Sequence, residues 1–170
     1  REILIRGMRE HLVSQKFLEV TTSKIVAAGA EGGSTLFPID YFGKKAYLAQ
    51  SPQLYKQMLM GAGLDRIFEL APAFRAEESD TVRHIAEFAS LDVEMSFIRS
   101  EEDVMNLLQG LLVHALECVL LEGKQYLDAL GVEVSVPKTP FPRITFEDAI
   151  KLLAESDLDV KGDLDTEAEK

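Results

Sequence analysis

The sequence predicts an α+β fold, in which an antiparallel sheet is flanked by helices, and three observations lead to this prediction. Strand-like segments are too numerous for a regular alternation of one strand with one helix. Two of them, Ile67–Arg75 and Ile85–Phe97, are joined by the polar segment Glu77–Arg83, which is typical of a long hairpin. Apolar residues at helical spacing occur in separate segments at the beginning, middle and end of the chain.

The composition is that of a globular protein large enough to bury a core. The 170 residues are 46% hydrophobic, and the longest apolar runs fall far short of the roughly 18 residues of a membrane helix. The N-terminus has no signal-peptide pattern. Cys118 is the single cysteine, which excludes an internal disulfide and makes the cytoplasm the default location. We expect Cys118 to be a small buried apolar side chain rather than a nucleophile. The net charge of −11 argues against a surface built mainly to bind nucleic acid.

The elements follow from periodicity and capping residues. Residues 1–16 are expected to form an amphipathic helix, because apolar side chains recur there at helical spacing. Ser51-Pro52 is expected to begin a second helix. The Ser51 hydroxyl suits the N-cap position, and proline is tolerated at the first helical position because its missing N–H has no partner there. The other expected elements are short strands at 17–20 and 25–28, a Gly-rich loop at 31–33, a hairpin at 41–48 turning at Gly43, a helix at 101–121 after a capping box of Ser100 and Asp103, and a last helix at 146–154 capped by Thr145.

Polar residues gather on one face of the long hairpin, because strand side chains alternate between faces. A solvated face with salt bridges is the better interpretation of any one of them. Together, an arginine fork, a histidine and an aromatic ring could hold a nucleoside triphosphate on a sheet, although the chain has no P-loop motif. The residues of this face are Glu69, Arg75 and Glu77 on the first strand, Phe88, Ser90, Asp92 and Glu94 on the second, and Arg83 and His84 at the hairpin end.

A second set of candidates precedes the hairpin. Gln53 and Lys56 share one face of the helix after Ser51 and could bind a small carboxylate substrate, while Leu54 and Met58 are expected to pack on another face. A lone helical lysine is nearly always a solvated charge. Glu31 is either a loop carboxylate that meets an ammonium group or part of a mobile polar turn.

Other kinds of site are not indicated. No set of histidine and cysteine has metal-ligand spacing, so no metal site is expected. The three histidines, His11, His84 and His114, give no identifiable Ser-His-Asp arrangement.

The hairpin resembles a known motif. Phe74–Glu77, Arg83–Phe88 and Leu91–Met95 look like motif 2 of class II aminoacyl-tRNA synthetases, in the wording of the aspartyl and asparaginyl branch. The sequence RHIAEF within it is similar to the archaeal and eukaryotic type of the aspartyl enzymes. Residues 29–60, with Glu31-Gly32-Gly33 and the segment AQSPQLYKQ, are similar to the amino-acid pocket, and residues 1–28 resemble motif 1, which forms the dimer interface of the family.

The resemblance implies a role for each candidate. Arg75 would bind the α-phosphate of ATP and the carboxylate of the amino acid. The remaining ATP-binding roles would belong to Glu77 on the adenine side, Arg83 at the hairpin end, His84 at the γ-phosphate and Phe88 stacked on adenine. For the amino acid, Glu31 and Gln53 would bind the ammonium group and Lys56 the side-chain carboxylate.

The chain departs from the family pattern at several points. Ser23 stands where motif 1 has its proline, and Lys16 where a glycine is usual, so both departures concern the dimer contact. Motif 3, the Mg²⁺-binding acidic residues and the anticodon-binding domain have no counterpart in these residues. We therefore expect a single partial catalytic domain of a longer protein, with most tRNA contacts elsewhere and no activity by itself.

The resemblance implies an aspartate–tRNA ligase that uses aspartate, ATP and tRNA and forms a homodimer through residues 1–28. One alternative is an asparaginyl-tRNA synthetase or a paralogue that activates aspartate without tRNA. Lys56 argues against asparagine, because a cation matches a carboxylate better than an amide. An alternative of another class is a non-catalytic dimerising interaction module. The sequence leaves open whether tRNA-Asn is also charged.

Overall fold

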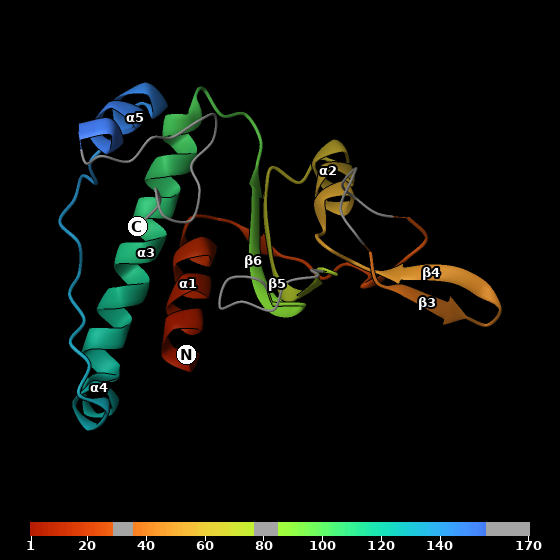
Figure 1. Cartoon of the computed structure of the whole chain (residues 1–170), viewed down its shortest axis with the longest axis horizontal. Helices are drawn as coiled ribbons and strands as arrows, with labels where there is room; N and C mark the ends of the chain where they lie inside the picture. Colours follow the sequence, from red (N-terminus) through yellow and green to blue (C-terminus); the bar gives the residue numbers. More distant parts are fainter. Residues whose placement is uncertain (29–35, 77–84, 156–170) are drawn as a thin grey trace. The chain divides into compact units, whose positions relative to one another are not determined.

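The computed structural model describes residues 1–28, 36–76 and 85–155 (Figure 1). The chain divides into two compact units, Arg1–Val136 and Pro137–Lys170, and only α5 of the elements lies in the second unit. In chain order the elements are α1 (Glu2–Ser14), β1 (Leu18–Glu19), β2 (Ile25–Val26), β3 (Pro38–Tyr41), β4 (Lys44–Leu48), α2 (Gln53–Gly61), β5 (Arg66–Phe74), β6 (Glu87–Met95), α3 (Glu101–Glu122), α4 (Lys124–Leu130) and α5 (Phe146–Glu155).

The α+β prediction is confirmed, with a correction to the sheet. The described strands form two three-stranded sheets, with the orders β1-β5-β6 and β2-β4-β3. The long hairpin is present: β5 and β6 pair antiparallel from Arg66↔Met95 to Phe74↔Glu87. The pairing of β1 with β5 is parallel, which the sequence analysis did not predict. Parallel pairing needs a long return connection, and residues 20–65 supply it.

The predicted hairpin turn at Gly43 is confirmed. Phe42 and Gly43 have φ values of 52° and 77°, and two central residues with positive φ are the signature of the type I′ turns that join twisted strands. Asp40 fixes the turn, because its Oδ1 atom accepts the Gly43 N–H at 2.8 Å.

The core lies between the helices α1 and α3 and the apolar face of the β5–β6 hairpin. Leu12, Phe17, Phe68 and Leu111 are buried at its centre. Leu91, Val93 and Met95 of β6 pack against them, which confirms that one face of the hairpin is apolar and packed. Figure 1 shows α1 running alongside α3 with the hairpin beyond it. The opposite face of the hairpin is therefore available for polar residues.

The predicted N-caps Ser100 and Thr145 are confirmed, but the bonds of Ser100 and Asp103 go to neighbouring residues and do not form the reciprocal pair of a capping box. The Ser100 hydroxyl accepts the N–H of Glu102 at 3.3 Å, and the Asp103 carboxylate accepts the N–H of Arg99 at 2.7 Å. The Thr145 hydroxyl accepts the N–H of Asp148 at 3.1 Å. The short helix α4, which follows α3 after Gly123, was not predicted.

The two departures in the motif 1 region have distinct structural consequences. Lys16 has φ 64°, in the left-handed region that glycine enters without steric cost, which explains why a glycine is usual at this position. Ser23 donates its hydroxyl hydrogen to the carbonyl oxygen of Ile25 at 2.7 Å, a bond that a proline could not make.

Among the described residues, α3 is the one helix long and apolar enough to cross a bilayer by length and composition. It has 22 residues and a mean hydropathy of 1.7 over its most apolar window. Core helices commonly have this composition, and Leu111 and Ala115 of α3 are buried in the core. Only 17% of that window is buried, however, and α3 is more apolar than the sequence analysis expected of any segment of this chain.

Candidate functional site

The polar face predicted for the β5–β6 hairpin is present. The strand register places Ala73 opposite Phe88, and Glu69 opposite Asp92, and residues directly opposite one another share a face. The ladder continues past β5, because the Arg75 N–H donates to the carbonyl oxygen of Ala86 at 2.9 Å. Arg75 and Phe88 therefore lie at the same end of this face.

Arg75 and Phe88 contact each other directly. The guanidinium carbon of Arg75 lies 5.4 Å from the centroid of the Phe88 ring, within the range of a cation–π contact. Arg75 is exposed and Phe88 is half-buried. An exposed guanidinium beside a partly exposed ring can bind an anionic group and stack on a planar one at the same place.

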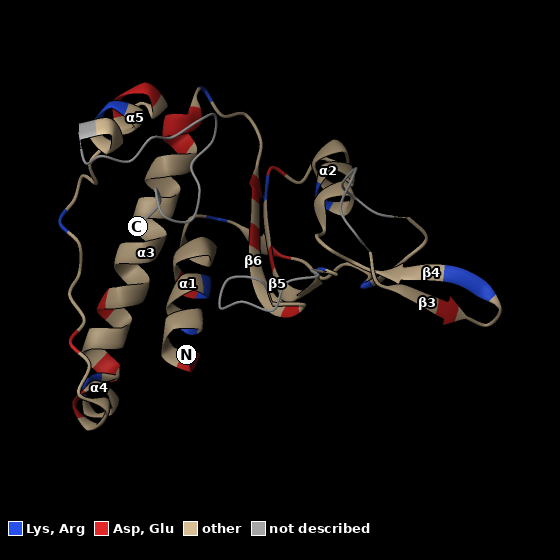
Figure 2. Ribbon diagram, in the orientation of Figure 1, with Lys and Arg blue, Asp and Glu red and all other residues tan. Residues whose placement is uncertain are grey.

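Lys56 lies farther along the same face and is 5% exposed. Its ammonium group is 3.3 Å from Asp92 Oδ1 and 3.4 Å from Glu94 Oε2, both on β6. We call these three residues the Lys56 cluster. Figure 2 shows the acidic positions of β6 and the single basic position of α2. Lys56 is thus not the solvated surface charge that a lone helical lysine usually is.

The predicted packing of α2 was wrong in one respect. Leu54 and Met58 were expected to pack, but they are 49% and 69% exposed, while the lysine face is buried. Leu54 and Met58 line a cavity of about 220 Å³ together with Val26, Ala27 and Ala49. The lysine face is buried because its charge meets two carboxylates, which periodicity alone cannot reveal.

A second ionic cluster lies on this face, of which the sequence analysis named Glu69 but not its partners. Glu69 is 2% exposed, and both of its carboxylate oxygens accept hydrogen bonds from Thr22, one from the N–H at 2.7 Å and one from the hydroxyl at 2.8 Å. Lys24 adds an ion pair at 2.9 Å. We call these three residues the Glu69 cluster. It ties the segment before β2 to the middle of β5. The one signal in the sequence was a carboxylate, Glu69, in the middle of a predicted strand.

The remaining candidates have a mixed outcome. Gln53 is half-buried in the first turn of α2, one turn before Lys56, and its N–H lies 3.4 Å from the hydroxyl oxygen of Ser51. Four further candidates lie outside the described residues: Glu31, Glu77, Arg83 and His84.

The buried ammonium of Lys56 and the exposed guanidinium of Arg75 are thus on one face, within a single hairpin and the helix before it. Asp92 and Glu94 are an addition to the predicted site, since the sequence placed them on this face without linking them to Lys56. Such a face can bind a small molecule with both a carboxylate and an ammonium group at one end and an anionic nucleotide at the other.

Comparison with known proteins gives a consistent result. The model of the family "tRNA synthetases class II (D, K and N)" matches residues 1–170. The aspartate–tRNA(Asp) ligase of Thermoplasma acidophilum is 54% identical over 92% of this chain and 36% of its own length. The aspartate–tRNA(Asp/Asn) ligase of Methanopyrus kandleri is 51% identical over 100% of this chain and 40% of its own length.

Among solved structures, the asparaginyl-tRNA synthetase of Pyrococcus horikoshii, complexed with asparaginyl-adenylate, superimposes with a TM-score of 0.88 at 34% identity. The match covers 99% of this chain and 39% of that one. The chain thus spans about two fifths of the length of these relatives. The chain belongs to the class II tRNA synthetase family of the D, K and N type, as the N-terminal part of its catalytic domain.

Proposed function

We propose that this chain provides the aspartate site and part of the ATP site of an enzyme that attaches aspartate to tRNA. The relatives that are 54% and 51% identical are aspartate–tRNA ligases, which supports this specificity. Because the chain spans about two fifths of their length, the complete reaction requires residues that it does not contain. The observation that carries the proposal is the buried ammonium of Lys56, on the same sheet face as Arg75 and Phe88.

The charges of the Lys56 cluster fit an amino acid with an acidic side chain. One lysine and two carboxylates have a net charge of −1, and the contacts of 3.3 and 3.4 Å are longer than a tight charge-assisted bond. The β-carboxylate of aspartate would pair with Lys56. Its ammonium group would be attracted by the excess negative charge and bound by Gln53 and Glu31. Asparagine would leave Lys56 facing a neutral amide, which favours aspartate.

The ATP end of the site is formed by the hairpin. Arg75 would bind the α-phosphate and the α-carboxylate of aspartate, and Phe88 would stack on adenine. Glu77 on the adenine side, Arg83 at the hairpin end and His84 at the γ-phosphate would complete it.

The reaction would take place in two steps. An α-carboxylate oxygen of aspartate attacks the α-phosphorus in line, the bond to pyrophosphate breaks, and aspartyl-adenylate forms. A ribose hydroxyl of the tRNA end then attacks the aspartyl carbonyl, and AMP leaves. Two anions must approach in the first step, so Arg75 acts by positioning and neutralising charge rather than by transferring a proton.

Mg²⁺ would accompany ATP and neutralise phosphate charge. Asp92 and Glu94 both face Lys56, so we assign no Mg²⁺ ligand to this part of the described face.

We also propose a cytoplasmic homodimer formed through residues 1–28. Val13 and Leu18 are 59% and 53% exposed there, which supports a further contact. The apolar face of α1 already packs on α3 and the hairpin, so the proposed contact would use side chains outside that face. A sedimentation experiment that finds only monomers of the intact protein at high concentration would contradict this.

The test is pyrophosphate exchange by the intact protein with aspartate, asparagine or no amino acid. Exchange should depend on aspartate, and Arg75→Ala should reduce it by about 100- to 1000-fold, the usual effect of removing one positioned electrostatic contact. Arg99→Ala, which truncates another exposed arginine just after β6, is the control and should keep full exchange.

Other outcomes would select the alternatives. Equal exchange with asparagine would contradict the aspartate specificity. Exchange without transfer to tRNA would indicate a paralogue that only activates aspartate. A folded protein that neither binds ATP nor catalyses exchange would indicate a non-catalytic dimerising module.

A further inference from the structure

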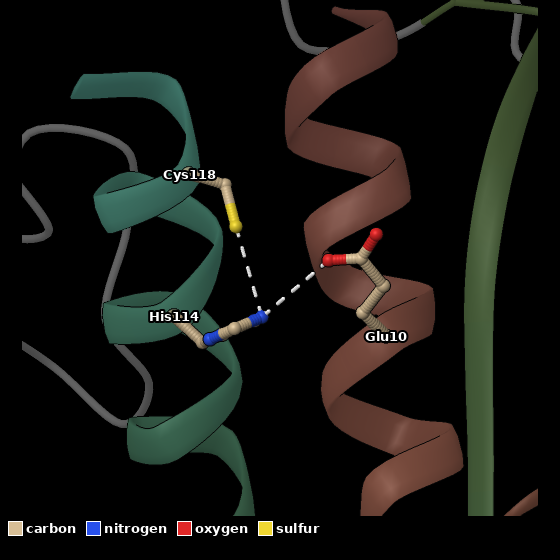
Figure 3. Close-up of side chains that lie close together, drawn as sticks. All are labelled: Glu10, His114 and Cys118. Carbon is tan, nitrogen blue, oxygen red and sulfur yellow. Dashed lines mark hydrogen bonds and ion pairs between the residues drawn. The ribbon is translucent and has the colours of Figure 1, made fainter. Parts of the chain in front are cut away.

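Three metal-ligating side chains meet between α1 and α3, on helices that the proposed substrate site does not use. His114 and Cys118 lie one turn apart on α3, and Glu10 faces them from α1 (Figure 3). His114 Nε2 is 3.7 Å from Cys118 Sγ and 3.8 Å from Glu10 Oε2. One ligand atom from each residue lies within 4.8 Å of the other two. We call these three residues the α1–α3 cluster.

The separations approach those of ligands that share one ion, although Glu10 lies somewhat too far away. Zinc binds sulfur at about 2.3 Å and nitrogen or oxygen at about 2.0–2.2 Å, so tetrahedral ligands of one ion lie about 3.3–3.7 Å apart. A nitrogen–oxygen distance of 3.8 Å is too long for a hydrogen bond. Glu10 has an exposed side chain on the surface of α1 and can close the remaining gap by a small rotation. Without an ion, His114 forms a weak hydrogen bond with Cys118 and a long ion pair with Glu10, and a bound ion would replace both contacts.

The types of ligand select the class of ion. A thiolate, an imidazole and a carboxylate form a mixed set of borderline softness, which suits Zn²⁺ and not the oxygen-preferring Mg²⁺ or Ca²⁺. We propose that Glu10, His114 and Cys118 bind one Zn²⁺ ion, with a water molecule as the fourth ligand. The ion would link α1 to α3.

The surroundings support this assignment. Arg6 binds the other carboxylate oxygen of Glu10, Oε1, at 3.1 Å, which leaves Oε2 directed at His114. Gly7 of α1 provides the room for the thiol, because a Cβ atom at this position would lie 3.1 Å from Cys118 Sγ. The nearby ring of His11, 5.7 Å from the ring of His114, is not one of the three ligands.

A reactive thiolate–imidazolium pair is a poorer explanation of the same residues. Burial, together with the negative charge of Glu10, raises the pKa of the Cys118 thiol above its ordinary value. A nucleophilic cysteine needs the opposite shift. The thiol proton is released when a metal binds, and the positive charge of the bound ion would then stabilise the thiolate beside Glu10.

The experiment uses the intact protein, stripped of metal by a chelator and titrated with Co²⁺ as a spectroscopic substitute for Zn²⁺. We expect a thiolate-to-cobalt charge-transfer band that saturates at one equivalent and disappears when Zn²⁺ is added. Cys118→Ser should abolish the band, and Glu10→Gln, a surface change that should not affect folding, should weaken Co²⁺ binding by at least about tenfold. His11→Gln, a neighbouring histidine outside the cluster, is the matched control and should leave the titration unchanged.

A second measurement is independent of the spectrum. Excess Zn²⁺ should raise the thermal midpoint of the stripped wild-type protein and leave that of Cys118→Ser unchanged, because a ligand that binds only the folded state stabilises it. The proposal is overturned if the charge-transfer band is absent or survives in Cys118→Ser, or if Zn²⁺ shifts both midpoints equally.

Discussion

Two ionic clusters lie on the same face of the β5–β6 hairpin, and they differ in how completely their charges are satisfied. In the Glu69 cluster one carboxylate meets one ammonium, and the contacts are 2.7, 2.8 and 2.9 Å. In the Lys56 cluster one ammonium faces two carboxylates at 3.3 and 3.4 Å. The first cluster is neutral and closed, whereas the second has an excess negative charge and longer contacts.

The difference separates a structural role from a binding role. A buried charge with all its partners fixes the chain around it and has nothing left to offer a ligand. A buried charge with loose and unbalanced partners can exchange one of them for a substrate group. The same sheet face thus holds the segment before β2 in place at Glu69 and, by our proposal, binds aspartate at Lys56.

Between the two clusters, the largest expected effect is on stability, from Glu69→Ala. This change leaves the Lys24 ammonium and the Thr22 N–H without their acceptor, and we expect a loss of about 3 kcal/mol in the free energy of unfolding. Urea unfolding of the intact protein measures it. Glu19→Ala is the control, because Glu19 forms an exposed ion pair with Arg9 and should cost less than about 1 kcal/mol. Equal losses in the two variants would contradict a structural role for Glu69.

The next effect is on activity, from Lys56→Met. The variant keeps the volume of the side chain and removes the charge that pairs with the β-carboxylate. We expect kcat/KM for aspartate in pyrophosphate exchange to fall about 100-fold, which is about 2.7 kcal/mol, while the KM for ATP changes little. Lys44→Met, an exposed lysine of β4, should change neither value. A weaker ATP interaction with unchanged aspartate kinetics would place Lys56 in the nucleotide site instead.

These two clusters also mark how far the sequence could predict the site. The alternation of side chains was sufficient to predict the hairpin, its apolar face and the shared polar face of Arg75 and Phe88. The alternation of side chains between two faces is a property of the strand itself and does not depend on what packs against it. Gln53 and Lys56 were found for the same reason, since the Ser51-Pro52 start and the helical period define their face.

The partners of those residues depend on packing between distant segments, and the sequence could not supply them. Asp92 and Glu94 were recognised as carboxylates of the polar face, but only the position of α2 brings Lys56 to them. Thr22 and Glu69 belong to segments that meet through the parallel pairing of β1 with β5, which was not predicted. His114 and Cys118 are one turn apart, but Glu10 comes from another helix, so the sequence could not show that the three side chains of the α1–α3 cluster lie together.

A smaller effect is expected from Lys24→Met. Glu69 would keep both hydrogen bonds from Thr22, and Lys24 is partly exposed, so the loss in the free energy of unfolding should be about 1–2 kcal/mol. Pyrophosphate exchange should stay close to wild type. Lys45→Met, an exposed lysine of β4, is the control for stability. A large loss of exchange at unchanged stability would show that Lys24 contributes to the substrate site and that the Glu69 cluster is not purely structural.

The smallest effect is expected from Glu94→Gln, and it tests the comparison most directly when paired with Glu69→Gln. In the Lys56 cluster the change removes the excess negative charge and leaves the ammonium paired with Asp92, so stability should change by less than about 1 kcal/mol. In the Glu69 cluster, Glu69→Gln replaces a carboxylate that accepts from an ammonium and an N–H with an amide, which also carries a donor. We expect this change to lower the free energy of unfolding by about 2 kcal/mol.

Glu94→Gln should instead raise the KM for aspartate severalfold, because less negative charge remains to attract the substrate ammonium. If both variants lose the same stability, completeness of pairing does not distinguish the two clusters. If Glu94→Gln leaves aspartate kinetics unchanged, the excess charge of the Lys56 cluster has no part in binding.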